Sequence, residues 1–153
     1  WIDTRAFERA HQRADALLTD GGAVTDADLE SLARRLLSLY PGHFLAGEDE
    51  NPWLLACRQR LASRIFRDLS AIGQLWEDRG APGKAELIYR RGVELDAVSE
   101  MLYRRLMSVQ TRRGDRAGAL ATYGRCRRML QMTLGVEPST ETEAAHRTAL
   151  EHP

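Results

Sequence analysis

The sequence has little lysine, cysteine or proline, and it has no long apolar run. Lys84 is the single lysine among 22 basic side chains. Two cysteines, Cys57 and Cys126, are too few for a disulfide framework or a zinc cluster. No segment approaches the roughly 20 apolar residues of a membrane-spanning helix, and the first residues lack a signal-peptide pattern. These absences exclude disulfide-rich secreted proteins and membrane-spanning proteins, and they predict a cytoplasmic domain that has no membrane partner.

The composition that is present is that of one globular domain. The 153 residues are 43% hydrophobic and 29% charged, which is enough apolar material for a self-supporting core. The 22 basic side chains are balanced by 22 acidic ones. The net charge of the chain therefore gives no reason to expect a protein that binds polyanions. From its length, residues 1–153 are predicted to form a single domain.

Apolar residues recur with the period of a helix along the whole chain, and no alternating β pattern is found. The pattern predicts an all-α fold of about seven helices: an N-terminal pair within 1–40, repeat-like hairpins within 52–135, and a C-terminal capping helix at 139–150. Asp26 is expected to cap the second helix. Ser139 or Thr140 is expected to cap the last one, where Thr140 with Glu143 fits a capping box. Phe44 is expected to be buried in the loop at 41–50.

Two segments of the chain are alike at a spacing of 34 residues. The identical pairs are Arg79 and Arg113, Gly80 and Gly114, Ala85 and Ala119, Tyr89 and Tyr123, and Arg91 and Arg125. This spacing is typical of tetratricopeptide-type helical hairpins. The predicted architecture is therefore a tetratricopeptide-like array with right-handed superhelical stacking, in which the alanine and tyrosine pairs occupy equivalent positions. An ordinary helical bundle is the alternative.

Several motifs resemble a known family. They are Leu39-Tyr40-Pro41-Gly42-His43-Phe44, then Pro52-Trp53 followed by Arg58 and Leu61, then Glu94-Leu95-Asp96, and finally Leu134-Gly135-Val136-Glu137-Pro138-Ser139. Together they resemble the bacterial transcriptional activator domain of SARP-type regulators. The resemblance covers nearly the whole chain, and the last string is its most specific part.

The resemblance implies a non-catalytic role in transcription regulation. The implied partners are proteins: a second copy, RNA polymerase or a neighbouring regulatory domain. Family members usually carry a winged-helix domain before this one, and the 153 residues contain no such pattern. The sequence is therefore expected to be a fragment of a larger regulator that contacts DNA only through a separate winged-helix domain.

Residues that could carry catalysis or bind a metal are sparse. The histidines His11, His43, His146 and His152 show no metal-ligand spacing. Glu143 and His146 lie three residues apart, where a solvated helix face is expected. Cys57 and Cys126 are expected to pack as small apolar residues. No enzyme, metal or cofactor is therefore predicted.

Arginines cluster in one part of this neutral chain. Eight arginines and one acid, Asp115, lie between Arg104 and Arg128. We define the predicted basic patch as Arg105, Arg112, Arg113, Arg116, Arg125, Arg127 and Arg128. Guanidinium groups suit phosphates and carboxylates alike, so the patch either binds an anionic partner or is neutralised by acids within the domain.

A helical-hairpin repeat also has a groove side, formed by its first helices. The predicted groove positions are Arg67, Ser70, Gln74 and Glu77, with their counterparts Met101, Arg104, Ser108 and Thr111. A protein segment bound there would explain an interaction role. Two alternatives remain at this stage: a sensor that binds a small anion through Arg67 and Arg104, and a generic scaffold unrelated to transcription.

Overall fold

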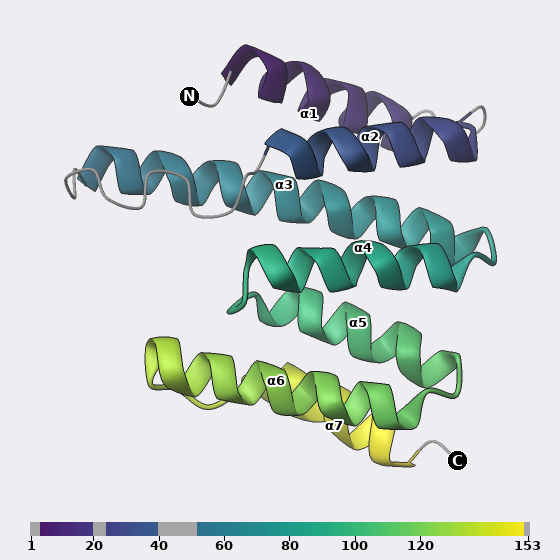
Figure 1. Cartoon of the computed structure of the whole chain (residues 1–153), viewed down its shortest axis with the longest axis vertical. Helices are drawn as coiled ribbons and strands as arrows, with labels where there is room; N and C mark the ends of the chain where they lie inside the picture. The colour runs from purple at the N-terminus through teal and green to yellow at the C-terminus, as the bar shows by residue number, and fades with distance from the viewer. Residues whose placement is uncertain (1–3, 20–23, 40–51, 152–153) are drawn as a thin grey trace. The chain divides into compact units, whose positions relative to one another are not determined.

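The computed structural model describes residues 4–19, 24–39 and 52–151, and in these ranges it contains helices and no strand (Figure 1). The helices are α1 (Thr4–Thr19), α2 (Asp26–Leu39), α3 (Pro52–Asp78), α4 (Pro82–Leu95), α5 (Glu100–Arg112), α6 (Arg116–Leu134) and α7 (Thr140–Glu151). The predicted all-α class and the predicted number of helices are confirmed. The expectations for Phe44 and for the Cys57 side chain lie outside the described residues.

The chain divides into two compact units, Trp1–Ile72 and Gly73–Pro153. The division falls within α3, whose last turns belong to the second unit. The first unit contains the hairpin of α1 and α2, which lie side by side (Figure 1). The buried apolar residues of this hairpin are small or branched and recur at helical spacing: Ala10, Ala14, Leu29, Leu32, Ala33 and Leu36.

The start of α2 is fixed by a reciprocal cap. The Thr25 hydroxyl and the Thr25 N–H both donate to Asp28 Oδ2, at 2.6 Å and 3.1 Å, and the Asp28 N–H donates back to the Thr25 hydroxyl. The prediction that Asp26 caps this helix is wrong. Asp26 is the first helical residue, and Thr25 takes the cap because Asp28 lies three residues later, as a capping box requires.

The turns at the two 34-spaced glycines are built alike. Gly80 has a φ of 72° and Gly114 a φ of 77°. Residues other than glycine rarely adopt this backbone conformation. The Gly80 N–H donates to the Glu77 carbonyl, and the Gly114 N–H donates to the Thr111 carbonyl. The next N–H in each turn reaches the carbonyl four residues before the glycine, at Trp76 and at Gln110 respectively, which completes a Schellman motif in both turns.

Packing between the hairpins repeats at the alanines but not at the tyrosines. Ala85 and Ala119 are both fully buried. Tyr89 is also fully buried, and its hydroxyl donates to Glu77 Oε1 at 2.6 Å. Tyr123 is half-buried and its hydroxyl donates to Glu143 of α7 instead. The tyrosines therefore have different surroundings, in contrast to the prediction.

The reason lies in the residues opposite each ring. Tyr89 packs against Gly73, where a side chain would collide with the ring. The equivalent position 34 residues later is Met107, which is itself fully buried. The counterpart of Glu77 is Thr111, and its short hydroxyl donates to the Met107 carbonyl within α5. Met107 and Thr111 thus stand where the first turn has Gly73 and Glu77, and the Tyr123 hydroxyl donates to the last helix instead.

The last helix packs against both α5 and α6. Gly135, with a φ of 68°, ends α6 in the left-handed conformation, as expected for a C-terminal cap. The predicted capping box of Thr140 with Glu143 is wrong, because Ser139 precedes the helix and Glu143 is bonded to Tyr123. The Ser139 N–H donates instead to Glu100 Oε2 at 2.8 Å, which ties the start of α7 to α5.

Candidate interaction surfaces

The predicted groove positions of the second unit are largely engaged within the molecule. Glu77 has a side chain that is 4% exposed and accepts a hydrogen bond from Tyr89. Gln74 accepts from Arg105 and donates to Asp78 at 2.9 Å. Glu77 also pairs with Arg112 of α5. A buried carboxylate is favourable only when it is fully partnered, so Glu77 links α3, α4 and α5 and is not available to a partner protein.

The groove positions on α5 differ from one another. Thr111 is buried, Met101 is half-buried and Ser108 is exposed. Arg104 is half-buried, and its Nη1 donates to the Thr142 hydroxyl at 3.1 Å and to the Ser139 hydroxyl at 3.4 Å. Among the predicted groove positions of α5, Ser108 is thus the exposed one.

Arg67 and Ser70, the remaining groove positions, lie in the first unit. The Arg67 side chain is 66% exposed, and its Nε lies 4.0 Å from Asp68 Oδ1. Ser70 is buried. Among these two residues, Arg67 is therefore the one that a partner can reach.

Within the basic patch, two arginines are paired with buried carboxylates. Arg112 forms an ion pair with Glu77, and Arg113 forms one with Glu86, whose side chain is 8% exposed. Glu86 also accepts from Arg90 one turn further along α4. These pairs hold the end of α5 against α3 and α4, so both guanidiniums have a structural role.

Two more members of the patch are engaged at the surface. Arg127 Nε lies 3.0 Å from Glu137 Oε2, and both side chains are mostly exposed. Arg105 donates to the Gln74 side chain. Three of the seven arginines of the patch are therefore paired with acids of the domain and Arg105 with an amide, while Arg116, Arg125 and Arg128 make none of the described ion pairs.

The first unit contains a cluster of ionisable side chains that sequence spacing did not predict. His11 Nδ1 of α1 lies 2.7 Å from Asp68 Oδ2 of α3, and His11 Nε2 lies 3.5 Å from Asp15 Oδ2. Burial raises the pKa of the Asp68 carboxyl, although the hydrogen bond with His11 acts in the opposite direction. The three residues form the group of potential metal ligands found among the described residues. Since Asp68 already takes one ring nitrogen, only His11 Nε2 and Asp15 would face an ion, so the pair of His11 and Asp68 is better explained as a buried link between helices.

Two further expectations concern residues of the second unit. Cys126 is a free, fully buried thiol, as expected for a small apolar residue, and burial raises its pKa to about 12. Glu143 and His146, however, are not on a solvated face. The His146 ring stacks on Tyr123 with centroids 3.7 Å apart, and both residues of α7 are half-buried.

Three of the five exposed large apolar side chains described in the second unit lie near the end of α6, and the other two are Leu87 and Leu150. Met132 is 80% exposed, Leu134 is 56% exposed and Val136 is 46% exposed, all within five residues. We call these three residues the apolar edge. Its backbone turns at the left-handed cap of Gly135, and the exposed Arg127–Glu137 ion pair lies next to it.

Comparison with known proteins identifies the family of the chain. Among the described residues, no helix has the length and apolarity needed to cross a membrane. Searches of curated proteins and of solved structures give no match. The family model of the bacterial transcriptional activator domain matches residues 2–150, which is nearly the full sequence. The chain thus belongs to the bacterial transcriptional activator domain family, the regulatory domain of activator-type transcription regulators.

Proposed function

We propose that the domain is a non-catalytic protein-interaction module of its regulator, and that it binds a protein partner through the apolar edge at Met132, Leu134 and Val136. The partner is a second copy of the domain, a neighbouring regulatory domain or RNA polymerase. The observation that carries the proposal is the exposure of three apolar side chains in one short segment. Exposed apolar surface is typical of interaction sites, and this segment has three exposed apolar side chains within five residues.

The position of the edge supports this role. Leu134 and Val136 belong to the string Leu134-Gly135-Val136-Glu137-Pro138-Ser139, the most specific motif of the chain. Ser139 at its end donates from its N–H and its hydroxyl to Glu100, at 2.8 Å and 2.7 Å. A segment held in this way loses little conformational freedom when a partner binds, which favours affinity.

Two of the predicted groove positions are open, one in each unit. Arg67 and Ser108 are exposed, so we propose that they contact a partner, whereas Gln74, Glu77 and Thr111 support the helices behind them. Direct DNA contact is assigned to a separate winged-helix domain, because most of the basic patch is engaged with acids and amides of the domain itself.

The test compares two substitutions that each replace an exposed apolar side chain by serine. Met132→Ser removes a side chain from the apolar edge, and Leu87→Ser removes one from α4, where Leu87 is 68% exposed. We expect the wild-type domain either to self-associate in sedimentation experiments or to retain RNA polymerase on a column. Met132→Ser should weaken that interaction by about tenfold, as is typical for the loss of an important apolar contact, and Leu87→Ser should leave it unchanged.

Two results would reject the proposal. One is a wild-type domain that stays monomeric at all concentrations and binds neither the polymerase nor the rest of its regulator. The other is an equal effect of Met132→Ser and Leu87→Ser, which would indicate general surface stickiness. Circular dichroism of both variants checks that the fold is retained.

A further inference from the structure

One face of α6 carries two arginines and two methionines side by side. Arg125, Arg128, Met129 and Met132 are spaced three and four residues apart, which places them on the same face of the helix. Arg128 and Met132 are exposed, and Arg125 and Met129 are half-buried. We call these four residues the α6 patch. Met132 is 80% exposed and also belongs to the apolar edge, so the patch continues that edge along the helix.

The two guanidiniums of the α6 patch keep their positive charge. Among the described ion pairs, neither Arg125 nor Arg128 has an acidic partner. The neighbour of Arg125 is the phenol of Tyr103, which is fully buried. Burial raises the pKa of Tyr103, and the Arg125 guanidinium acts in the opposite direction. A phenol is neutral near pH 7, so this neighbour does not cancel the charge of the arginine.

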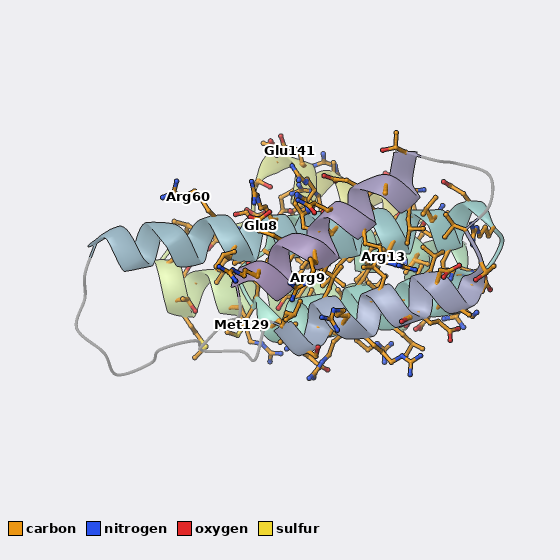
Figure 2. The ribbon with its side chains drawn as sticks, turned by 90° about the horizontal axis from the view of Figure 1, so that it is seen from above. Glu8, Arg9, Arg13, Arg60, Met129 and Glu141 are labelled. Carbon is orange, nitrogen blue, oxygen red and sulfur yellow. The ribbon has the colours of Figure 1, made fainter. Side chains whose placement is uncertain are left out.

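The acids that follow α6 in the sequence are engaged elsewhere. Glu137 pairs with Arg127 at 3.0 Å, and Glu143 accepts a hydrogen bond from a tyrosine hydroxyl of α6. Figure 2 shows Glu141 of α7 in the upper part of the view and Met129 of α6 in the lower part, well apart from each other. These acids therefore leave the charge of the α6 patch available to a partner.

Next to the patch, α6 has a glycine that its own packing does not require. The interior glycine of α3, Gly73, is explained by Tyr89, because a Cβ there would collide with the ring. At Gly124 of α6, in contrast, nothing lies within 4 Å of a Cβ. Glycine in a helix interior is unfavourable relative to alanine. Its presence is explained if the backbone of a partner approaches α6 at this point, where Ala121, one turn earlier, is also small and exposed.

The chemistry of the partner follows from these side chains. From Ala121 to Met132 the surface extends over about 17 Å, or about three turns, which suits a second helix lying along α6. Guanidinium groups match the geometry of carboxylates. Methionine side chains adapt to apolar surfaces of varied shape and are common where a protein binds an amphipathic helix. A second copy bound through the same patch would bring arginines against arginines, which disfavours self-association here.

We propose that the α6 patch binds an acidic amphipathic helix of a partner protein. The carboxylates of that helix pair with Arg125 and Arg128. Its apolar side chains pack on Met129 and Met132, and its backbone approaches α6 at Gly124. The inference rests on the proposed function, because Met132 belongs to both surfaces, and it adds the chemistry of the partner segment.

The test uses the full 153-residue chain and two synthetic helical peptides as probes. One peptide has leucines along one helix face flanked by glutamates, and the other has lysines in place of the glutamates. Each is labelled with a fluorophore and titrated at constant ionic strength, with anisotropy as the readout. We expect saturable binding of the glutamate peptide and no binding of the lysine peptide. Arg128→Gln should weaken binding by about tenfold, as expected when a charge-assisted contact is lost. Arg116→Gln is the matched control, since Arg116 is an exposed arginine of the same helix outside the patch.

Gly124→Leu tests the close approach independently of charge. The open space around position 124 can take the new side chain, so the fold should be retained, while binding of the glutamate peptide should fall at least tenfold. Gly83→Leu on α4 is its control, because nothing lies within 4 Å of a Cβ there either. It should bind the peptide like the wild type. Circular dichroism of all variants checks that the helices are intact.

Absence of saturable binding of the glutamate peptide, or equal binding of the two peptides, would overturn the inference. Equal losses in Arg128→Gln and Arg116→Gln would also overturn it, because the attraction would then come from general charge. So would unchanged binding in Gly124→Leu.

Failure of this inference is distinguishable from failure of the proposed function. If Met132→Ser abolishes self-association or polymerase binding but the glutamate peptide does not bind, the proposed function stands and the acidic helix is rejected. If the glutamate peptide binds as expected but the domain neither self-associates nor binds the polymerase or the rest of its regulator, the patch stands and the partners named above are rejected.

Discussion

Tyr89 lies so close to Gly73 that a Cβ at position 73 would be 2.4 Å from the ring carbon Cε1. The glycine thus lets α4 approach α3 and gives the Tyr89 hydroxyl access to Glu77, to which it donates at 2.6 Å. Gly73 and Tyr89 thus form a close contact between the last turns of α3 and the helix α4. It explains why a glycine is tolerated in the interior of a long helix, where it is otherwise unfavourable.

Gly73→Ala is therefore expected to destabilise the domain, although alanine is the better helix former. Overpacking of this kind costs about 1–3 kcal/mol of the free energy of unfolding, because the fully buried ring has little room to move. Gly124→Ala on α6 is the matched control, since nothing lies within 4 Å of a Cβ there. It should stabilise by up to about 1 kcal/mol. Urea unfolding measures both, and a stabilised Gly73→Ala variant would contradict the packing described.

The two equivalent turns give a second prediction. Gly80→Ala and Gly114→Ala each force a side chain into the left-handed region and should each cost about 1 kcal/mol. The costs should agree with each other, because the hydrogen bonds of the two turns are the same. Gly83→Ala, with open space around it and no positive φ, serves as the control. Very different costs at positions 80 and 114 would contradict the equivalence of the turns.

A third prediction concerns the link between α5 and α7. Glu100 Oε2 accepts from the Ser139 N–H, the Ser139 hydroxyl and the Thr142 hydroxyl, at 2.8, 2.7 and 2.6 Å. Glu100→Ala leaves these donors without their acceptor and should cost about 1–3 kcal/mol. Trypsin should then cleave α7 faster at the exposed Arg147, because local opening of the helix becomes easier.

The control for this variant is Glu94→Ala. Glu94 pairs with Arg91 at 2.6 Å, but both side chains are about half exposed, so its loss should cost less than about 0.5 kcal/mol. Similar losses in both variants would show that the bonds of Glu100 add nothing beyond a surface charge.

The linkage of Glu100 to pH has a definite sign. Burial acts to raise the pKa of Glu100, but the hydrogen bonds from Thr142 and Ser139 outweigh it, so the net pKa lies below the ordinary value of 4.5. The stabilisation by this carboxylate is thus present above pH 4.5 and is lost as the pH falls through the lowered pKa of the folded state. The free energy of unfolding of Glu100→Ala should accordingly fall less steeply in acid than that of the wild type.

Alkaline pH should weaken the domain for the opposite reason. Burial raises the pKa of Tyr89 from 10.0 to about 12, and burial with the hydrogen bond to Glu143 raises that of Tyr123 to about 12. Above pH 10.0 the unfolded chain releases these protons while the folded chain keeps them, so stability is lost as the pH rises toward about 12. In Tyr89→Phe the slope of stability against pH should be smaller by up to about 1.4 kcal/mol per pH unit. An unchanged slope would contradict the burial of the phenol.

Cys126 should be inert in the folded protein. Its side chain is fully buried, and burial raises its pKa to about 12, so thiolate is scarce near pH 8. In a Cys57→Ser background, a thiol reagent should react with Cys126 only at the rate at which the protein unfolds. Rapid labelling under native conditions would contradict the packing of α6.

Local signals predicted the helices of this domain well, because apolar periodicity acts within a few residues, although the caps assigned to Asp26 and to Thr140 with Glu143 were wrong. The 34-residue spacing also relates the two glycine turns, which have the same hydrogen bonds. It did not predict the surroundings of Tyr123. These depend on Met107, 16 residues away, which occupies the position equivalent to Gly73. A repeat in sequence transfers a turn more reliably than it transfers a side-chain contact.

Contacts between distant residues could not be predicted from spacing. His11 and Asp68 are 57 residues apart, and their pairing requires the relative placement of α1 and α3. Arg9, Arg13 and Arg35 each look like ordinary members of a polar helix face, and only the register of α1 against α2 brings them to one pocket. The predicted groove was affected in the same way, because the partners of Glu77 and Arg104 come from other helices.

The position of α7 has a consequence for the length of the array. With the 34-residue spacing, the helix that follows α6 would begin at Leu134, but α7 begins at Thr140, six residues late. The delay allows Ser139 to reach Glu100 and lets α7 fold back over α5 and α6. At this end the helices therefore leave the 34-residue phase, and the two hydrogen bonds from Ser139 to Glu100 hold α7 in the shifted position.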